Sequence, residues 1–412
     1  MIIPGKGDRR KRVLAFILAG GKGQRLEPLT VYYPKPAVAF GGVYKIIDFT
    51  LSNCLNSDIR NIYALVQYKS AELIRHLRDG WQMYFSTARG EYLEIIPPQY
   101  AGTDQSYVGT ADAIYQNLYL IEQEQPDYVV ILAGDHIYKM DYRRMIETHR
   151  QNEADLTVGS VEMPLRESIH FGVIQADAEN RIVGFQEKPK DATPIPGNPE
   201  HFFASMGIYV FKPQVLIDFL MRDAADSSSH HDFGKDIITK MVASHRVFTY
   251  SFIDENRKTA KYWRDVGTLD AYYYANMDLI GVDPVLNLYD ASWPILSAPV
   301  QAPPPKTVFR ENGRTGIAVD SMLSPGCIVS GGRVIHSILS PYVNVHSWAH
   351  VEDSILFERV DVARHARIRR AIVTEGVRIP EGAEIGYNPD RDRDRFILTE
   401  QGVVIVQKGA KI

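Results

Sequence analysis

Residues 13–26 read VLAFILAGGKGQRL, a short apolar run that ends in a turn rich in glycine. Such a run is typical of a strand that is buried on both faces of a sheet. Similar runs occur at residues 62–66 and 128–133, and apolar residues at helical spacing follow in residues 111–123 and 142–150. The alternation predicts an α/β domain with a mainly parallel, Rossmann-like sheet that binds ligands beyond the carboxyl ends of its strands.

The glycine-rich turn predicts a site for an anion. Gly20, Gly21 and Gly23 allow backbone N–H groups to approach a phosphate closely, and Arg25 adds a positive charge in the same turn. Lys35 follows ten residues later between two prolines, which restrict its backbone and direct its ammonium at the same pocket. The glycine spacing matches neither the dinucleotide-binding fingerprint nor the P-loop, which disfavours both classes of site.

Length and composition limit the class of protein. The 412 residues exceed one ordinary domain, and a net charge of −4 gives no reason to expect a nucleic acid or an acidic membrane as partner. The only cysteines, Cys54 and Cys327, are too few for a disulfide framework or a zinc site, which favours a reducing compartment. No run approaches the ~20 apolar residues of a membrane span, so we expect a cytoplasmic protein.

A different pattern follows a stretch rich in proline. Aliphatic residues recur in five columns with a step of 17, and some columns lie six residues apart. Six-residue spacing is typical of hexapeptide repeats, which form a left-handed parallel β-helix. We expect Ile317 to mark an earlier coil, residues 402–406 to add a capping strand, and residues 388–395 to form a charged surface loop. The columns are Ile328, Val345, Val362 and Ile379; Val334, Val351, Ile368 and Ile385; Ile338, Ile355 and Ile372; Leu339, Leu356 and Val373; and Val343, Val360 and Val377.

These patterns predict four regions of the chain. Residues 1–12 form a basic N-terminal tail, and residues 13–282 form the α/β domain. Residues 283–310 form a proline-rich connector, and residues 311–412 form the β-helix with its C-terminal cap.

Several strings of sequence resemble a known family. The turn at residues 18–26, with Lys35-Pro36 after it, is similar to the signature of the nucleoside-diphosphate-sugar pyrophosphorylases. Within that superfamily, four strings resemble the glucose-1-phosphate adenylyltransferases of bacterial glycogen synthesis: IIDF at 46–49, AGDHIYKMDY at 133–142, HDFGKD at 231–236 and YWRDVGT at 262–268. The likeness covers nearly the whole chain, because that family also carries a C-terminal left-handed β-helix. It implies a nucleotidyltransferase that converts ATP and α-D-glucose 1-phosphate to ADP-glucose and pyrophosphate.

Two aspartates are the candidate metal ligands. Asp135 follows the run at 128–133 after one glycine, which places its carboxylate at the carboxyl end of the sheet, and Asp265 lies in another short strand-like segment. Two carboxylates suit Mg²⁺, whose remaining ligands are phosphate and water oxygens. The resemblance implies that Arg25 and Lys35 act with this pair in catalysis. We expect Asp48 and Asp141 to be helix caps or structural partners instead.

The resemblance also assigns the substrate-binding residues. Lys188 would pair with the sugar phosphate, and Glu187 would accept hydrogen bonds from sugar hydroxyl groups. The residues matched to glucose 1-phosphate binding are Tyr107, Gly172, Glu187, Lys188 and Ser205, and those matched to nucleotide binding are Gly20, Gly21, Gly23, Arg25, Lys35, Gln99 and Gly109.

Regulation and assembly are expected to follow the family in part. Many members are homotetramers that phosphorylated metabolites control through basic residues in the loop before the lysine matched by Lys35. In this chain that loop reads Val-Tyr-Tyr at 31–33, and Ser106 replaces a tryptophan that the family often has before Tyr107. We therefore expect a weak or altered response to such effectors, with Lys45 and the N-terminal basic cluster as candidate contacts.

Two alternatives remain open. A sugar nucleotidylyltransferase that uses UTP or dTTP would share the glycine turn and Lys35. A non-catalytic regulatory subunit would share both domains but lose site residues, whereas the charged residues assigned above are all present.

Overall fold

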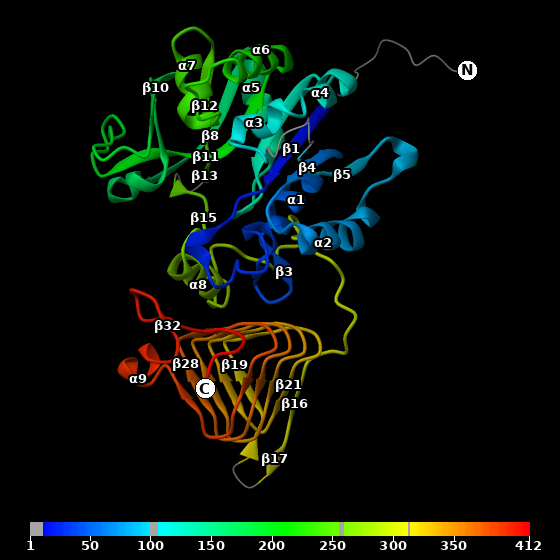
Figure 1. Ribbon diagram of the computed structural model, residues 1–412, viewed down its shortest axis with the longest axis vertical. Coiled ribbons are helices and arrows are strands. Elements are labelled where there is room, and N and C mark those ends of the chain that lie inside the picture. The colour runs from blue at the N-terminus through cyan, green and yellow to red at the C-terminus, as the bar shows by residue number, and fades with distance from the viewer. Residues whose placement is uncertain (1–10, 99–105, 255–258, 312–313) are drawn as a thin grey trace.

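The computed structural model describes residues 11–98, 106–254, 259–311 and 314–412, which form an α/β domain above a β-helix (Figure 1). Strand β1 lies in the middle of the α/β sheet, paired in parallel with β4 and β6, and β4 pairs in parallel with β5. Strand β11 continues the sheet antiparallel to β6. The strands of this sheet are β1 (Val13–Ala19), β4 (Asn61–Val66), β5 (Tyr92–Ile96), β6 (Tyr128–Ala133), β8 (Leu156–Pro164), β9 (Gly172–Ala176), β10 (Ile182–Glu187), β11 (His201–Phe211) and β12 (Val247–Ser251).

The alternation of side chains along β1 explains why the sheet is covered on both faces. Ala15 and Ile17 belong to one buried cluster, and Leu14 and Phe16 belong to another on the opposite face. The helices that contribute to the first cluster are α1 (Ile46–Asn56), α2 (Ala71–Trp81) and α5 (Tyr142–Gln151), and those of the second are α3 (Thr110–Tyr115), α4 (Leu118–Glu124), α6 (Pro213–Ala224) and α7 (Thr239–Val242). The predicted fold class is confirmed for this domain.

The predicted helix over residues 111–123 is wrong in one respect, because it is two helices. Asn117 separates α3 from α4, and its side-chain amide donates hydrogen bonds to the Ala113 carbonyl and to the Tyr107 hydroxyl. Asparagine competes in this way with the regular helix ladder, and the break follows from that competition. The same contact connects the helix to the loop before α3.

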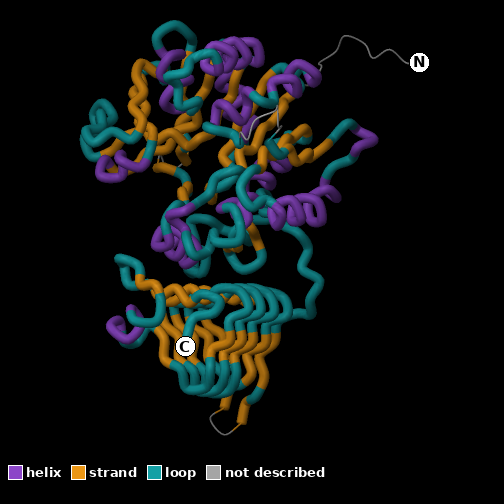
Figure 2. The backbone as a smooth tube through the Cα atoms, viewed as in Figure 1, coloured by secondary structure: helices purple, strands orange, loops and turns teal. Residues whose placement is uncertain are grey.

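The C-terminal domain is a parallel β-helix whose strands stack in three sheets (Figure 2). Residue 351 pairs with residues 334 and 368, and residue 355 pairs with 338 and 372, so the predicted 17-residue step is confirmed in these coils. The sheets are β16 (Lys306–Val308), β21 (Ile328–Ser330), β24 (Asn344–Val345), β27 (Asp361–Val362) and β30 (Arg378–Ile379); β19 (Ile317–Val319), β22 (Arg333–Ile335), β25 (His350–Glu352), β28 (Arg367–Arg369) and β31 (Glu384–Ile385); and β20 (Met322–Leu323), β23 (Ile338–Leu339), β26 (Ile355–Leu356), β29 (Ala371–Val373), β32 (Ile397–Leu398) and β33 (Val404–Val406).

The first coils depart from the regular step. Val329, not the predicted Ile328, pairs with Val345 and is fully buried, because the step here is 16 residues. The coil expected at Ile317 is present as β19, in which Ala318 pairs with Val334. Strand β16 begins at Lys306 and pairs with β21, within the range predicted as connector.

The C-terminal end closes the β-helix. Strand β33 pairs in parallel with β29, so the expected additional strand at residues 402–406 is confirmed. The predicted surface loop at residues 388–395 is wrong, since a short helix, α9 (Pro389–Arg393), lies there. Asn388 caps this helix, and Asp392 is buried and accepts hydrogen bonds from the Gly386 amide and from Arg395. A short run of alternating charges forms a helix here because its caps are satisfied.

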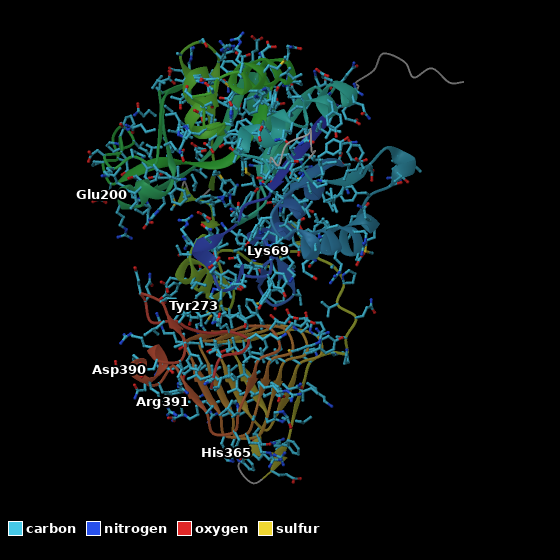
Figure 3. All side chains as sticks on the ribbon, viewed as in Figure 1. Lys69, Glu200, Tyr273, His365, Asp390 and Arg391 are labelled. Carbon is cyan, nitrogen blue, oxygen red and sulfur yellow. The ribbon has the colours of Figure 1, made fainter. Side chains whose placement is uncertain are left out.

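One face of the β-helix packs against the α/β domain. Ile338, Ile355 and Ile372 point out of the β-helix into a buried cluster shared with α8 (Leu269–Met277). Tyr273 of α8, labelled at the junction in Figure 3, donates a hydrogen bond of 2.7 Å to the Asp353 carbonyl. Burying such side chains contributes about 2 kcal/mol each, which makes this a firm junction between the domains.

The connector is fastened to α1. Trp293 donates a hydrogen bond to Asn53 at 2.9 Å, and Ser297 donates one to Asp48 at 2.7 Å. Asp48 is fully buried and also accepts hydrogen bonds from the Lys45 amide and Trp81.

Asp141 accepts a hydrogen bond from the Arg143 amide at the start of α5. The expectation that Asp48 and Asp141 are structural is therefore met by their contacts.

Among the helices in the described ranges, none combines the length and the apolar character needed to cross a membrane.

His149 on α5 gives the α/β domain a pH-dependent stability. Its side chain is buried, its Nδ1 lies 3.0 Å from the Thr157 hydroxyl, and burial and then the charge of Lys212 lower its pKa to about 4. In the unfolded chain histidine titrates near pH ~6.5, so the unfolded state binds the extra proton between these values. Stability is therefore complete above about pH 6.5 and is lost as the pH falls towards about 4.

We expect urea unfolding to show this loss directly. Between about pH 7.5 and about pH 5, the free energy of unfolding should fall by roughly 2 kcal/mol on account of His149. The variant His149→Gln, which cannot titrate, should lack that part of the pH dependence. Equal pH dependence in both proteins would contradict the assignment.

Candidate active site

A cavity of about 730 Å³ lies beyond the carboxyl ends of β1 and β6. It gathers residues from the glycine turn, from β9 to β11 and from two short strands near residues 136 and 264. Gln99, also predicted to bind nucleotide, lies outside the described residues. The predicted site residues that line the cavity are Gly20, Gly21, Gly23, Arg25, Lys35, Tyr107, Gly109, Asp135, Gly172, Glu187, Lys188, Ser205 and Asp265.

The glycine turn packs directly on Lys35. Gly23 has a φ of 63°, and a Cβ built on it would lie 2.9 Å from the Lys35 Cβ, so a larger residue would be strained and would collide. A Cβ built on Gly21 meets nothing within 4 Å, which leaves that backbone open to the cavity. The turn therefore presents an accessible backbone beside a cation, as an anion site requires.

Asp135 and Asp265 are brought together by a pair of three-residue strands. Strand β7 (His136–Tyr138) runs antiparallel to β15 (Trp263–Asp265), with His136 opposite Asp265. Asp135 directly precedes β7, so the two carboxylates lie side by side although 130 residues separate them in the chain. The ammonium of Lys35 bridges them, 2.9 Å from Asp135 and 2.6 Å from Asp265.

The charges of this cluster depend on one another. Burial would raise the pKa of Asp135, but Lys35 and then His136 outweigh it and lower that pKa to about 2. Burial would lower the pKa of Lys35, and the two carboxylates instead raise it above its usual value. Asp135 is therefore ionised and Lys35 is protonated near neutral pH.

The same cluster fits a divalent cation. Ligand atoms of Asp135, His136 and Asp265 all lie within 4.8 Å of one another. Carboxylate oxygens are the ligands that Mg²⁺ prefers, whereas an imidazole is better suited to transition metals. The His136 ring packs edge-on against Trp263, and its Nδ1 is buried with no hydrogen-bond partner in the described structure.

Arg25 approaches the cluster from the glycine turn. A Cβ built on Gly267 would lie 3.0 Å from Arg25 Nη2 and 3.1 Å from Asp265 Oδ2, so the guanidinium and this carboxylate border the same glycine. The predicted grouping of Arg25, Lys35, Asp135 and Asp265 thus corresponds to one compact arrangement of charges.

Glu187 and Lys188 line the same cavity. Glu187 ends β10 opposite Gly172 of β9, and the Lys188 ammonium lies 3.3 Å from the Glu187 carboxylate. Gly172 and Gly234 border this carboxylate: Cβ atoms built on them would lie 3.1 Å and 2.6 Å from Glu187 Oε2. The Lys188 side chain is 58% exposed, which leaves its charge free to pair with an incoming anion.

Ser205 lies at an irregular point of β11. The register between β11 and β8 shifts between Ser205 and Tyr209, and both residues line the cavity. Gly207 within this bulge has a φ of 66°. A bulge of this kind turns side chains of a strand towards a site, and here it faces the same space as Lys188.

The loop before α3 is held by the HDFGKD segment. Asp232 accepts a hydrogen bond from the Thr110 hydroxyl at 3.1 Å, and the His231 carbonyl accepts the Ala111 amide at 2.8 Å. A Cβ built on Gly109 would lie only 2.2 Å from that carbonyl. Tyr107 also lines the cavity. Its hydroxyl accepts a hydrogen bond from Asn117, and its carbonyl accepts one from Gln67.

Gly109→Ala should therefore disturb the loop before α3, where the resemblance places nucleotide-binding residues. The methyl group must move the backbone of one segment, at a cost of about 1–3 kcal/mol. We expect a lower thermal midpoint and a KM for ATP at least about fivefold higher. Gly281→Ala is the matched control, because a Cβ there meets nothing within 4 Å. An unchanged KM and midpoint for Gly109→Ala would contradict the packing argument.

Sequence reasoning missed several residues that line the cavity. Asp232, Tyr209 and Trp263 were not assigned to the site, and neither was His136. Three of these four residues lie within the strings that resemble the family, so the strings could have been used to predict them as site residues. Tyr209 has no such signal, since its position depends on the bulge in β11.

Comparison with known proteins gives one consistent family. Residues 14–281 match the family described as nucleotidyl transferase, and residues 303–406 match the GlmU-like C-terminal hexapeptide, which agrees with a left-handed β-helix. A glucose-1-phosphate adenylyltransferase of Koribacter versatilis is 51% identical over 396 residues, covering 96% of this chain and 95% of that protein. Proteins of the same name from Rhodopirellula baltica and Methylococcus capsulatus are 52% and 50% identical, covering 98% and 96% of this chain and 91% and 93% of those proteins.

Proposed function

The chain belongs to the glucose-1-phosphate adenylyltransferase family, and we propose that its cavity transfers the adenylyl group of ATP to α-D-glucose 1-phosphate, with Asp135 and Asp265 as the metal-binding pair. The products are ADP-glucose and pyrophosphate, and ADP-glucose serves glycogen synthesis as glucosyl donor. The observation that carries the proposal is the pairing of β7 with β15, which joins both carboxylates to Lys35 and to the glycine turn.

The reaction needs no general base. An oxygen of the sugar phosphate is already ionised near neutral pH, so it attacks the α-phosphorus directly while the bond from that phosphorus to the β-phosphate oxygen breaks. The described residues supply position and charge. Lys188 holds the phosphate of the sugar, Glu187 accepts hydrogen bonds from its hydroxyl groups, and Arg25 with the glycine turn holds the phosphates of ATP.

The charge balance of the cavity supports the proposal that it binds a divalent metal ion. Among the described residues that line the cavity, the cations are Lys22, Arg25, Lys35 and Lys188 and the acids are Asp135, Glu187, Asp232 and Asp265, so these charges balance. Two phosphorylated substrates add on the order of six negative charges, which such a cavity does not neutralise unaided. A Mg²⁺ ion held by Asp135 and Asp265 would offset part of this charge and stabilise the transition state.

A metal titration tests this proposal. ADP-glucose formation should stop when a chelator removes divalent cations and return on addition of Mg²⁺. Asp265→Asn should raise the Mg²⁺ concentration needed for half-maximal rate by at least about tenfold. ADP-glucose formation at full rate in the presence of chelator would overturn the metal assignment.

We further propose that phosphorylated metabolites act weakly on this chain. The Tyr33 hydroxyl donates a hydrogen bond of 2.9 Å to Glu375 of the β-helix, and Lys45 lies over the Tyr33 ring at 5.9 Å. Glu358 lines the same space between the domains, so two carboxylates face the point where a basic loop would be needed. Burial and then the Glu375 contact raise the pKa of Tyr33 to about 12, so the tyrosine stays neutral.

The N-terminal basic cluster, the other candidate contact for effectors, is described only in part. Residues 1–10 lie outside the described residues, and Lys11 and Arg12 both contact Asp127. The homotetramer stays a prediction, which the mass of the protein in solution tests.

Fructose 1,6-bisphosphate should change kcat/KM by less than about threefold. The reason is that its phosphates would meet Glu375 and Glu358 in place of a cationic loop. Activity with and without the effector, at subsaturating ATP, is the measurement. Activation by more than about tenfold would refute the weak-effector proposal and leave the proposed reaction intact.

A further inference from the structure

The ammonium of Lys35 occupies the space between the two metal-binding carboxylates. It lies 2.6 Å from Asp265 Oδ1 and 2.9 Å from Asp135 Oδ2, distances typical of charge-assisted hydrogen bonds. The lysine side chain is only 7% exposed, whereas the carboxylates are 33% and 19% exposed. The cation already bound to this pair is therefore part of the protein.

A metal ion and this ammonium compete for the same oxygens. Both carboxylates are within 3 Å of Lys35 Nζ, and their ligand atoms belong to a group that spans no more than 4.8 Å. Within a group of that size, a divalent ion bound to both carboxylates would lie a few ångströms from the ammonium. Charges of the same sign at such a separation in a partly buried site repel strongly. Binding of the metal therefore requires the ammonium to move or weakens its hold.

The backbone of Lys35 is packed in place, whereas its long side chain lines the cavity. The residue begins a short 3₁₀ helix, η2 (Lys35–Ala37), between Pro34 and Pro36, and its Cβ is packed against Gly23. The four methylenes of the side chain can rotate while this anchor stays in place. Gly21 lines the same cavity, and a Cβ built on it meets nothing within 4 Å, so its backbone is open where the phosphates of the nucleotide are proposed to bind.

We propose that Lys35 is an internal counter-ion that neutralises Asp135 and Asp265 until nucleotide phosphates draw its ammonium away, so that metal and nucleotide bind cooperatively. The inference rests on the proposed function only in taking this pair as the metal site and the glycine turn as the phosphate site. Lys35 acts here as a positioning residue, through the charge it gives to or removes from the carboxylates.

The proposed coupling between nucleotide binding and metal binding is positive, and it can be measured. Without nucleotide the ammonium opposes metal binding, and with nucleotide it pairs with phosphate and releases the carboxylates. By linkage, the nucleotide raises metal affinity by the same factor by which the metal raises nucleotide affinity. A lysine that served only as a phosphate ligand would leave the affinity for metal alone unchanged.

The test is a titration with Mn²⁺ alone, followed by EPR of the free ion. Lys35→Met should bind Mn²⁺ at least about tenfold more tightly than the native protein in the absence of nucleotide. Lys22→Met is the matched control, because Lys22 lines the same cavity but is not among the residues that contact Asp135 or Asp265. It should change the affinity by less than about threefold.

A second titration adds an ATP analogue with a methylene group between its α- and β-phosphates. The analogue should tighten Mn²⁺ binding to the native protein more than it does to Lys35→Met, because the variant has no ammonium to displace. If Lys35→Met does not fold, Lys35→Gln keeps a polar group between the carboxylates and should show the same two changes. Mn²⁺ binding to a folded variant that is no tighter than in the native protein would overturn the inference.

The result is separable from the proposed function. Pyrophosphate release by the native protein from ATP and glucose 1-phosphate tests the reaction, whereas the Mn²⁺ titrations involve no turnover. Tighter metal binding in Lys35→Met with no pyrophosphate release by the native protein would refute the reaction and retain the counter-ion.

Discussion

Asp135→Asn is expected to lower kcat by at least about a thousandfold while the protein remains folded. The amide removes one of the two negative charges proposed to hold the metal, and it removes one of the two carboxylate partners of Lys35, 2.9 Å away. Loss of roughly 4 kcal/mol of charge stabilisation at the α-phosphorus under attack corresponds to this factor. Pyrophosphate release at saturating substrates, measured over a series of Mg²⁺ concentrations, gives the number.

The matched control for this change is Asp141→Asn. Asp141 is six residues further along the same string, where it caps α5, and asparagine caps helices equally well. That variant should keep kcat within about twofold. Native turnover by Asp135→Asn at every Mg²⁺ concentration, with an unchanged circular dichroism spectrum, would remove Asp135 from the site.

Lys188→Met is expected to raise the KM for glucose 1-phosphate by about a hundredfold and to leave the KM for ATP within about threefold. The ammonium is the cation beside Glu187 in the part of the cavity proposed to bind the sugar phosphate, and a hydrogen bond between charged groups contributes about 1.5–3 kcal/mol. Without it, Glu187 would face the sugar phosphate with no compensating charge. Initial rates with each substrate varied in turn separate the two constants.

Lys190→Met serves as the control for Lys188→Met. Lys190 is exposed, lies two residues away and is not among the residues that line the cavity. It should leave both constants unchanged within about twofold. A rise in both KM values for Lys188→Met would show that this lysine adds only to the overall charge of the cavity, and it would contradict a specific role in binding the sugar phosphate.

The sequence predicts the fold well wherever periodicity is long. The 17-residue step is counted over several coils, and it identifies the β-helix because each coil repeats the geometry of the one before it. The repeat also indicates where the two domains meet, which the sequence-based prediction did not include. The columns at 338 and 339 are adjacent in the chain, so they must point to opposite faces: Leu339 into the β-helix and Ile338 towards the α/β domain. An outward aliphatic column predicts a partner surface.

Local patterns were weaker guides. The stretch at 111–123 reads as one helix by spacing alone, but Asn117 makes tertiary contacts that spacing does not reveal. Residues 388–395 read as a loop by composition, but buried Asp392 stabilises a short helix. In both places a single polar side chain with a specific partner decides the local structure.

The sequence predicts residues that the structure brings to one cavity, but it does not predict how they are arranged there. Asp135 follows from its place at a strand end, and Arg25 follows from the glycine turn. The contact between Lys35 and both aspartates depends on strands of three residues, which are too short for any periodic signal. The counter-ion arrangement therefore emerges only from the structure.

Pyrophosphate release by the purified chain, with glucose 1-phosphate and Mg²⁺ and with ATP, UTP or dTTP in parallel, tests the central claim most directly. The account predicts release with ATP and a kcat/KM for ATP at least about tenfold above that for either other nucleotide. Release that is faster with UTP or dTTP would assign the chain to another sugar nucleotidylyltransferase. No release with any nucleotide would identify a non-catalytic subunit and contradict the account.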